Sequence, residues 1–128
     1  GGNISAGEQN IPSTENEPRQ KEITTDAANN LIRVSFKARE STYGISVEKG
    51  TSAYEAMEKL ASTTPFKFNS VYYSGLGYFV DGINGIQNKD GYYWTLFVNG
   101  KYSNIGASDY KLLEGDQIEW KYTNQPNN

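Results

Sequence analysis

The 128-residue chain contains neither cysteine nor histidine. The first absence excludes disulfides, thiolate zinc sites and cysteine nucleophiles, and the second removes the commonest general base and metal ligand. No apolar run approaches the roughly 18 residues that a membrane-spanning helix needs, and no charged-then-apolar start resembles a signal peptide. Much enzyme chemistry is therefore out of reach, and we expect a soluble chain.

Aromatic residues are missing from residues 1–30, because all 17 of them (10 Tyr, 5 Phe and 2 Trp) lie after residue 35. Residues 1–30 carry five acids and two bases, and the difference equals the whole net charge of −3. Such a segment cannot bury enough apolar area to offset its conformational entropy. We therefore predict a flexible, polar, acidic leader over residues 1–30, one domain over residues 31–123 and a disordered tail over residues 124–128.

The predicted domain is formally neutral, with ten acids and ten bases left over from the totals of 15 and 12. Nucleic-acid binding normally needs a basic face, so we expect no nucleic-acid partner. A polar leader before a compact domain suits a secreted or surface-tethered bacterial protein, with its export signal and any lipid anchor outside this sequence. We therefore expect an extracellular or cell-surface location.

Alternating residues predict two strands that pair as a hairpin near the start of the domain. The segment 31–38 places Ile32, Val34 and Phe36 on one face, which is the period of a half-buried strand. After a polar turn over residues 39–42, a second segment points Tyr43, Ile45 and Val47 inward.

A helix and a run of strands follow this hairpin. Ser52 and Glu55 have the spacing of a capping box, and an apolar stripe continues to about Thr63, before Pro65. β-branched and aromatic segments then predict strands, Asn99-Gly100 predicts a type I′ hairpin turn, and residues 117–122 alternate again. The order predicts an α+β fold, a β-grasp-like mixed sheet with one packed helix.

Several motifs carry weak chemical signals. Gly75-Leu76-Gly77 begins like a dinucleotide loop, but a strand rather than a helix follows it. Asn88, Asp90 and Asp81 could suggest a calcium site, although their spacing favours a turn. A pair of carboxylates 5 to 9 Å apart, roughly the range that glycosidases use, would be needed for hydrolase activity. We predict no catalytic residue, no metal site and no cofactor.

Tyrosine is the residue that the sequence has in excess. Tyr72, Tyr73, Tyr78, Tyr92 and Tyr102 are too many for one small interior, so some should be exposed as flat binding plates. The alternative is that tyrosine-rich strands simply cover a thin sheet. In the strand over residues 93–98, one row of side chains must face the core. We assign three aromatic and aliphatic residues to that core: Trp94, Ile118 and Trp120.

From Gly77 to Trp120 the chain has the pattern G-Y-F-V-x-x-I-x-G, then Y-W, then G-x-x-x-x-x-G-A-x-x-Y, then L-x-x-G-D-x-I-x-W. Together with "GTSAYEAM" at residues 50–57, this resembles the transcobalamin-like C-terminal domain, a bacterial domain of unknown function. The family is similar to the small β-rich lid of cobalamin carriers such as intrinsic factor and transcobalamin, which closes over the corrinoid against a large helical barrel.

The resemblance implies which residues would border a ligand. The carriers' Ser-Trp-Gly-Pro-Tyr loop corresponds to residues 75–79, with Leu76 in place of tryptophan and Tyr78 in place of proline. The predicted ligand-binding residues are Gly75, Leu76, Gly77, Tyr78, Phe79, Tyr92, Tyr93, Ser103, Asn104, Ile105 and Gly106.

The resulting hypothesis is a non-enzymatic, secreted or surface-tethered module that binds a small-molecule ligand, with a corrinoid (cobalamin) as the first candidate. The chain has no helical barrel, so the domain alone should bind weakly. The alternative is a spacer or interaction module of the bacterial envelope that contacts another protein or a glycan.

Overall fold

The computed structural model describes residues 30–125, which include one α-helix and eight strands. The helix is α2 (Ala53–Thr63), and the strands are β1 (Leu31–Ala38), β2 (Ser41–Glu48), β3 (Phe68–Tyr73), β4 (Gly77–Ile83), β5 (Ile86–Gln87), β6 (Tyr93–Val98), β7 (Lys101–Tyr102) and β8 (Gln117–Thr123). Residues 1–29 of the predicted leader and the last three residues of the predicted tail lie outside this described part. No helix within residues 30–125 is long and apolar enough to cross a membrane.

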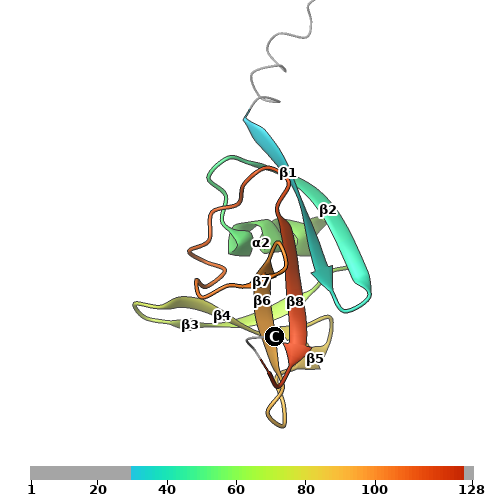
Figure 1. Ribbon diagram of the computed structural model, residues 1–128, viewed down its shortest axis with the longest axis vertical. Helices are drawn as coiled ribbons and strands as arrows, with labels where there is room; N and C mark the ends of the chain where they lie inside the picture. The colour runs from blue at the N-terminus through green and yellow to red at the C-terminus, as the bar shows by residue number, and fades with distance from the viewer. Residues whose placement is uncertain (1–29, 126–128) are drawn as a thin grey trace, which may run out of the picture. The chain divides into compact units, whose positions relative to one another are not determined.

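The larger sheet has the strand order β2-β1-β8-β6-β7. Its first and last strands in sequence, β1 and β8, lie side by side and parallel, with Phe36 opposite Ile118. β6 then pairs antiparallel with β8, placing Leu96 opposite Trp120. α2 lies behind this sheet in Figure 1. A mixed sheet of this order with one packed helix confirms the predicted α+β, β-grasp-like fold.

The core forms where α2 meets the inner face of the larger sheet. The alternating rows predicted from the sequence do face inward, because Ile32, Val34 and Phe36 of β1 are buried together with Met57 and Leu60 of the helix. The three residues assigned to the core, Trp94, Ile118 and Trp120, are buried in the same cluster.

The predicted capping box starts α2. The Ser52 hydroxyl accepts a hydrogen bond from the Glu55 N–H at 3.1 Å, and the Glu55 carboxylate accepts one from the Ser52 N–H at 3.0 Å. Each bond satisfies a backbone donor that has no partner in the helix. The hydrogen bond from the Ser52 N–H to the Glu55 carboxylate is the main cause of the lowered pKa of Glu55.

Strands β3, β4 and β5 form a second, antiparallel sheet in the order β3-β4-β5, which the strand pattern did not predict. Both hairpins in it close locally, and the β4–β5 turn is Asn84-Gly85, with φ of 49° and 86°. Because each strand pairs with its sequence neighbour, none of the three needs the larger sheet. In Figure 1 the β3–β4 hairpin extends to one side of the body.

Two predicted turns can be compared with the structure. Asn99 and Gly100 have φ of 52° and 84°, so the predicted I′ geometry is confirmed. The polar turn predicted over residues 39–42 is shorter, because β2 already begins at Ser41. Only Arg39 and Glu40 connect the strands, and Arg39 takes the positive φ of 58° that a tight turn requires.

Candidate functional site

A groove of about 430 Å³ opens beside β6. Its lining residues are Tyr78, Phe79, Val80, Tyr93, Trp94, Thr95, Leu96, Tyr102, Ser103, Asn104, Ile105, Gly106, Ala107 and Trp120. None of these side chains is charged. The groove is therefore suited to an uncharged, largely apolar ligand surface, held by aromatic contacts and a few polar groups.

The groove runs along two strand edges. Residues 93–96 are consecutive in β6, and all of them line it, as do residues 78–80 of β4. Successive side chains of a strand point to opposite faces. Four consecutive residues can therefore border one hollow only where the edge of the strand, including its backbone, faces that hollow.

The groove reaches down to the hydrophobic core. Trp94, Leu96 and Trp120 are each no more than 6% exposed, yet they line it. The Trp94 indole donates a hydrogen bond to the Ile86 carbonyl at 2.7 Å. The buried indole N–H of Trp120, by contrast, has no hydrogen-bond partner within residues 30–125. The deep part of the groove is thus formed by side chains of the hydrophobic core.

Aromatic and aliphatic side chains form the rim. Phe79 is 46% exposed, Tyr93 50%, Tyr102 44% and Ile105 48%. Tyr78 stacks on Tyr54 of the helix, with ring centroids 4.4 Å apart and an interplanar angle of 11°. These plates have apolar faces that remain open to a ligand, and tyrosine adds a polar tip.

The side wall is the segment 103–107, which is fixed at both ends. Ser103 donates its backbone N–H to the Leu96 carbonyl at 2.9 Å, and its hydroxyl donates to the Ile105 carbonyl at 2.8 Å. At the other end, the Ala107 carbonyl accepts from the Tyr54 N–H at 3.0 Å. That N–H lies in the first turn of α2 and has no partner inside the helix, so the wall is held by the start of the helix.

A buried carboxylate fixes the chain that follows the wall. Asp116 is 4% exposed and accepts hydrogen bonds from the Asn99 amide at 2.9 Å, the Tyr110 hydroxyl at 2.8 Å and the Leu113 N–H at 2.9 Å. Burial, together with the hydrogen bond to Asp116, raises the pKa of Tyr110 to about 12. The Tyr110 carbonyl also accepts from the Ala53 N–H at 2.9 Å, which links this cluster to α2.

The structure brings part of the predicted ligand-binding set together. The groove is lined by Tyr78, Phe79, Tyr93, Ser103, Asn104, Ile105 and Gly106. Gly75 and Leu76 instead occupy the turn at the tip of the β3–β4 hairpin, where Leu76 is 78% exposed. Gly77 begins β4 with φ of 93°, and the next residue, Tyr78, donates its N–H to the Ser108 hydroxyl at 3.0 Å.

Sequence reasoning missed several groove residues, namely Val80, Thr95, Leu96, Tyr102 and Ala107 as well as the core residues Trp94 and Trp120. Alternation along β6 predicts which side chains share a face. It does not predict that an edge stays unpaired, because this depends on where β7 ends. The excess of tyrosines was the one available signal, and it included Tyr102.

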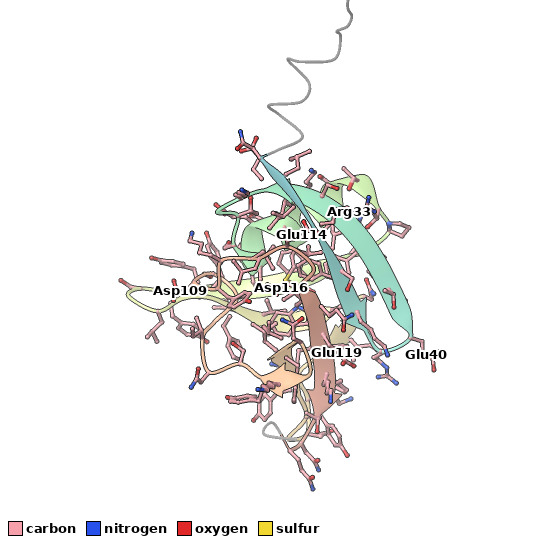
Figure 2. All side chains as sticks on the ribbon, turned by 45° about the horizontal axis from the view of Figure 1, so that its top comes forward. Arg33, Glu40, Asp109, Glu114, Asp116 and Glu119 are labelled. Atoms are coloured by element: carbon pink, nitrogen blue, oxygen red, sulfur yellow. The ribbon has the colours of Figure 1, made fainter. Side chains whose placement is uncertain are left out.

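The remaining predicted ligand-binding residue, Tyr92, lies in a second hollow of about 580 Å³. Its ring stacks on Tyr122, with centroids 5.6 Å apart. Two carboxylates, Glu40 and Glu119, and two cations, Arg39 and Lys121, also line this hollow. Figure 2 shows Glu40 at the β1–β2 turn and Glu119 on β8. Consecutive tyrosines thus face different hollows.

The residues considered for a calcium site are used in a turn. The Asn88 side-chain oxygen accepts a hydrogen bond from the Trp94 N–H at 2.9 Å, and Asp90 and Gly91 have φ of 56° and 83°. One carboxylate oxygen of Asp81 is buried without a hydrogen-bond partner in the described part. Residues 30–125 contain no group of three or more acidic side chains placed to hold a metal ion.

The fold and part of the sequence are similar to known proteins. Haptocorrin, crystallised in complex with Cbi, superposes with a TM-score of 0.67 at 26% identity; the match covers 73% of this chain and 25% of haptocorrin. The chain therefore spans about a quarter of the haptocorrin length.

A protein from Ruminococcus gnavus, described as a candidate metal-binding protein, superposes with a TM-score of 0.55 at 14% identity, over 73% of this chain and 96% of that one. This second likeness shows the fold alone. No curated protein shows significant sequence similarity to the chain. Residues 50–124, more than half of the chain, match the family described as Domain of unknown function (DUF4430). The chain therefore belongs to the DUF4430 family.

Proposed function

We propose that the domain is a non-enzymatic ligand-binding module that holds an uncharged ring system in the groove between β4 and β6, and that this ligand is a corrinoid. The observation that carries the proposal is the uncharged, aromatic lining of this groove. Its support from the comparisons is the similarity to haptocorrin, which was crystallised with Cbi. Flat apolar faces with polar tips suit a large ring whose periphery is polar.

The groove's chemistry supports binding rather than catalysis. No carboxylate, lysine or arginine lines it, and the chain has no histidine or cysteine. The hydroxyl of Thr95 donates to the Tyr93 carbonyl at 3.3 Å, and that of Ser103 donates to the Ile105 carbonyl. Within residues 30–125, the groove lining contains no base that could activate either hydroxyl as a nucleophile.

The module should act as one half of a binding site. A groove of about 430 Å³ that is open along its length cannot surround a corrinoid, and tight small-molecule sites bury most of their ligand. We expect a dissociation constant of roughly millimolar for the domain alone, because little of the ligand is desolvated. A second surface, supplied by another polypeptide, would raise the affinity.

Two adjacent tyrosines provide a matched test. Tyr93 lines the groove and is 50% exposed, whereas Tyr92 lines the second hollow and is 41% exposed. In calorimetric titration with dicyanocobinamide, Tyr93→Ala should weaken binding by about fivefold, since one aromatic ring contributes about 1 kcal/mol. Tyr92→Ala should bind like the wild type. Equal affinity for all three proteins, or no heat at near-millimolar ligand, would overturn the proposal.

We also propose that the protein is exported and acts outside the cell or at its surface, attached through a lipid outside this sequence. The polar first 30 residues support this placement. Protease treatment of intact cells should degrade the protein. Its protection until the cells are lysed would contradict a surface location.

The second candidate function is interaction with an envelope protein or glycan, and the β3–β4 hairpin favours it. Residues 68–80 contain no charge, and Tyr72, Tyr73 and Leu76 are at least half exposed. Tyrosine, serine and glycine also dominate the binding loops of antibodies. Glycan arrays and pull-downs from envelope extracts, compared between the wild type and Leu76→Ser, would test it. Identical retention by the two proteins would speak against a role for the hairpin tip.

A further inference from the structure

Along the edge of β6 that faces the groove, only part of the backbone is hydrogen-bonded to another strand. β7 pairs only with Phe97 and Val98, and beyond this point no strand of residues 30–125 pairs with β6 on this side. Two single hydrogen bonds replace a ladder. The Leu96 carbonyl accepts from the Ser103 N–H at 2.9 Å, and the Trp94 N–H donates to the Asn88 side chain at 2.9 Å.

These two bonds show which backbone groups point into the groove. The N–H and C=O of one strand residue point toward the same neighbouring strand. Because the Leu96 carbonyl points away from β8, the Leu96 N–H does so too, and the same reasoning applies to the Trp94 carbonyl. One donor and one acceptor, separated by Thr95, therefore lie on this edge with no strand of residues 30–125 paired to them, and Ser103 is the residue beside Leu96.

An added parallel strand would use a donor and an acceptor in this arrangement. The residue placed opposite Thr95 would donate its N–H to the carbonyl of the preceding residue, Trp94, and accept with its C=O from the N–H of the following residue, Leu96. We infer that the ligand docks amide groups on this edge, with an amide N–H donating to the Trp94 carbonyl and an amide C=O accepting from the Leu96 N–H. This inference rests on the proposed function and names the polar chemistry that the groove recognises.

Amides can come from two sources that fit an uncharged aromatic groove. A corrinoid carries carboxamide side chains around its ring, and an extended peptide turns the N–H and the C=O of one residue, which belong to two successive amides, toward the same side. Charged groups would instead be left unpaired, because no charged side chain lines the groove. The chemistry shared by both sources is an amide beside an apolar surface.

Hydrogen exchange measured by NMR tests the inference. In the free protein the Leu96 amide should exchange faster than the amides of Thr95 and Phe97, which face β8. Saturation with dicyanocobinamide should slow Leu96 exchange by about tenfold, as expected for a new backbone hydrogen bond. Dicyanocobyrinate heptamethyl ester keeps the ring but has no N–H. It should bind about tenfold more weakly, because the Trp94 carbonyl stays unpaired.

A second arm uses N-acetyl-Val-Thr-Val-methylamide and its N-methylated analogue as peptide probes. Protection of Leu96 by this peptide alone would keep the amide site and remove the corrinoid. Cobinamide binding that is weakened by Tyr93→Ala, with Leu96 exchange unchanged, would keep the proposed function and overturn the amide site. Equal affinity for cobinamide and its ester would also overturn it. If neither probe binds, both proposals fail.

Discussion

The carboxylate of Asp116 should be one of the most sensitive positions in the domain, because three donors converge on it. Asp116→Ala leaves the Tyr110 hydroxyl, the Leu113 N–H and the Asn99 amide without their acceptor. A hydrogen bond to a charged group contributes about 1.5 to 3 kcal/mol. Because water can reach the partly buried donors in the variant, we expect a total loss of about 3 to 4 kcal/mol.

Urea unfolding followed by tryptophan fluorescence measures this loss directly. For a domain of about 100 residues, each kcal/mol corresponds to about 4 to 8 °C in Tm, so thermal unfolding should occur roughly 15 to 25 °C lower. Asp109→Ala is the matched control, because Asp109 is an exposed carboxylate in the same loop, as Figure 2 shows. It should change stability by less than about 0.5 kcal/mol. A loss below about 1 kcal/mol for Asp116→Ala would refute the role assigned to the cluster.

Three further predictions concern the helix and its surroundings. Burial and the hydrogen bond to Asp116 raise the pKa of Tyr110 from 10 to about 12, so the folded state holds the hydroxyl proton more tightly than the unfolded state. The resulting stabilisation of the folded state is complete below about pH 10 and is lost as the pH rises toward 12. The stability difference between wild type and Tyr110→Phe should therefore shrink between pH 8 and pH 11.5 in urea titrations, and a constant difference would contradict this. Ser52→Ala should lower the free energy of unfolding by about 1 kcal/mol, and a loss of zero would show that the capping box is not used. Because the pKa of Glu55 is lowered in the folded state, the stabilisation by the Glu55 carboxylate should be present above the ordinary pKa of Glu55 and disappear as the pH falls below it. Leu60→Ala, at a site 1% exposed, should cost about 2 to 5 kcal/mol in the same assay, and a loss below about 1 kcal/mol would mean that the site is not in the core.

Most of the fold could be predicted from local patterns. The alternating rows of β1 and β8 require one face to be buried, and Ser52 with Glu55 marks the helix start regardless of the rest of the chain. Asn99-Gly100 fixes a hairpin because few other pairs adopt two positive φ values. These signals depend on neighbours in sequence, so the sequence contains them.

The separation into two sheets and the position of the groove could not be predicted in the same way. The strand pattern of β3 to β5 is that of strands in general, and no residue in it states which sheet a strand joins. The open edge of β6 arises because β7 is only two residues long and because the chain turns away at Ser103. The family resemblance pointed to part of the groove rim, but the hypothesis drawn from the sequence placed Tyr92 beside Tyr93 as if both met one ligand.

Chemical-shift mapping by ¹H–¹⁵N NMR during titration with dicyanocobinamide tests the central claim most directly. The account predicts that the largest shifts fall on residues 78–80, 93–96 and 103–107, which line the groove. Shifts confined to the second hollow, around Glu40 and Tyr92, or spread evenly over the domain, would contradict it.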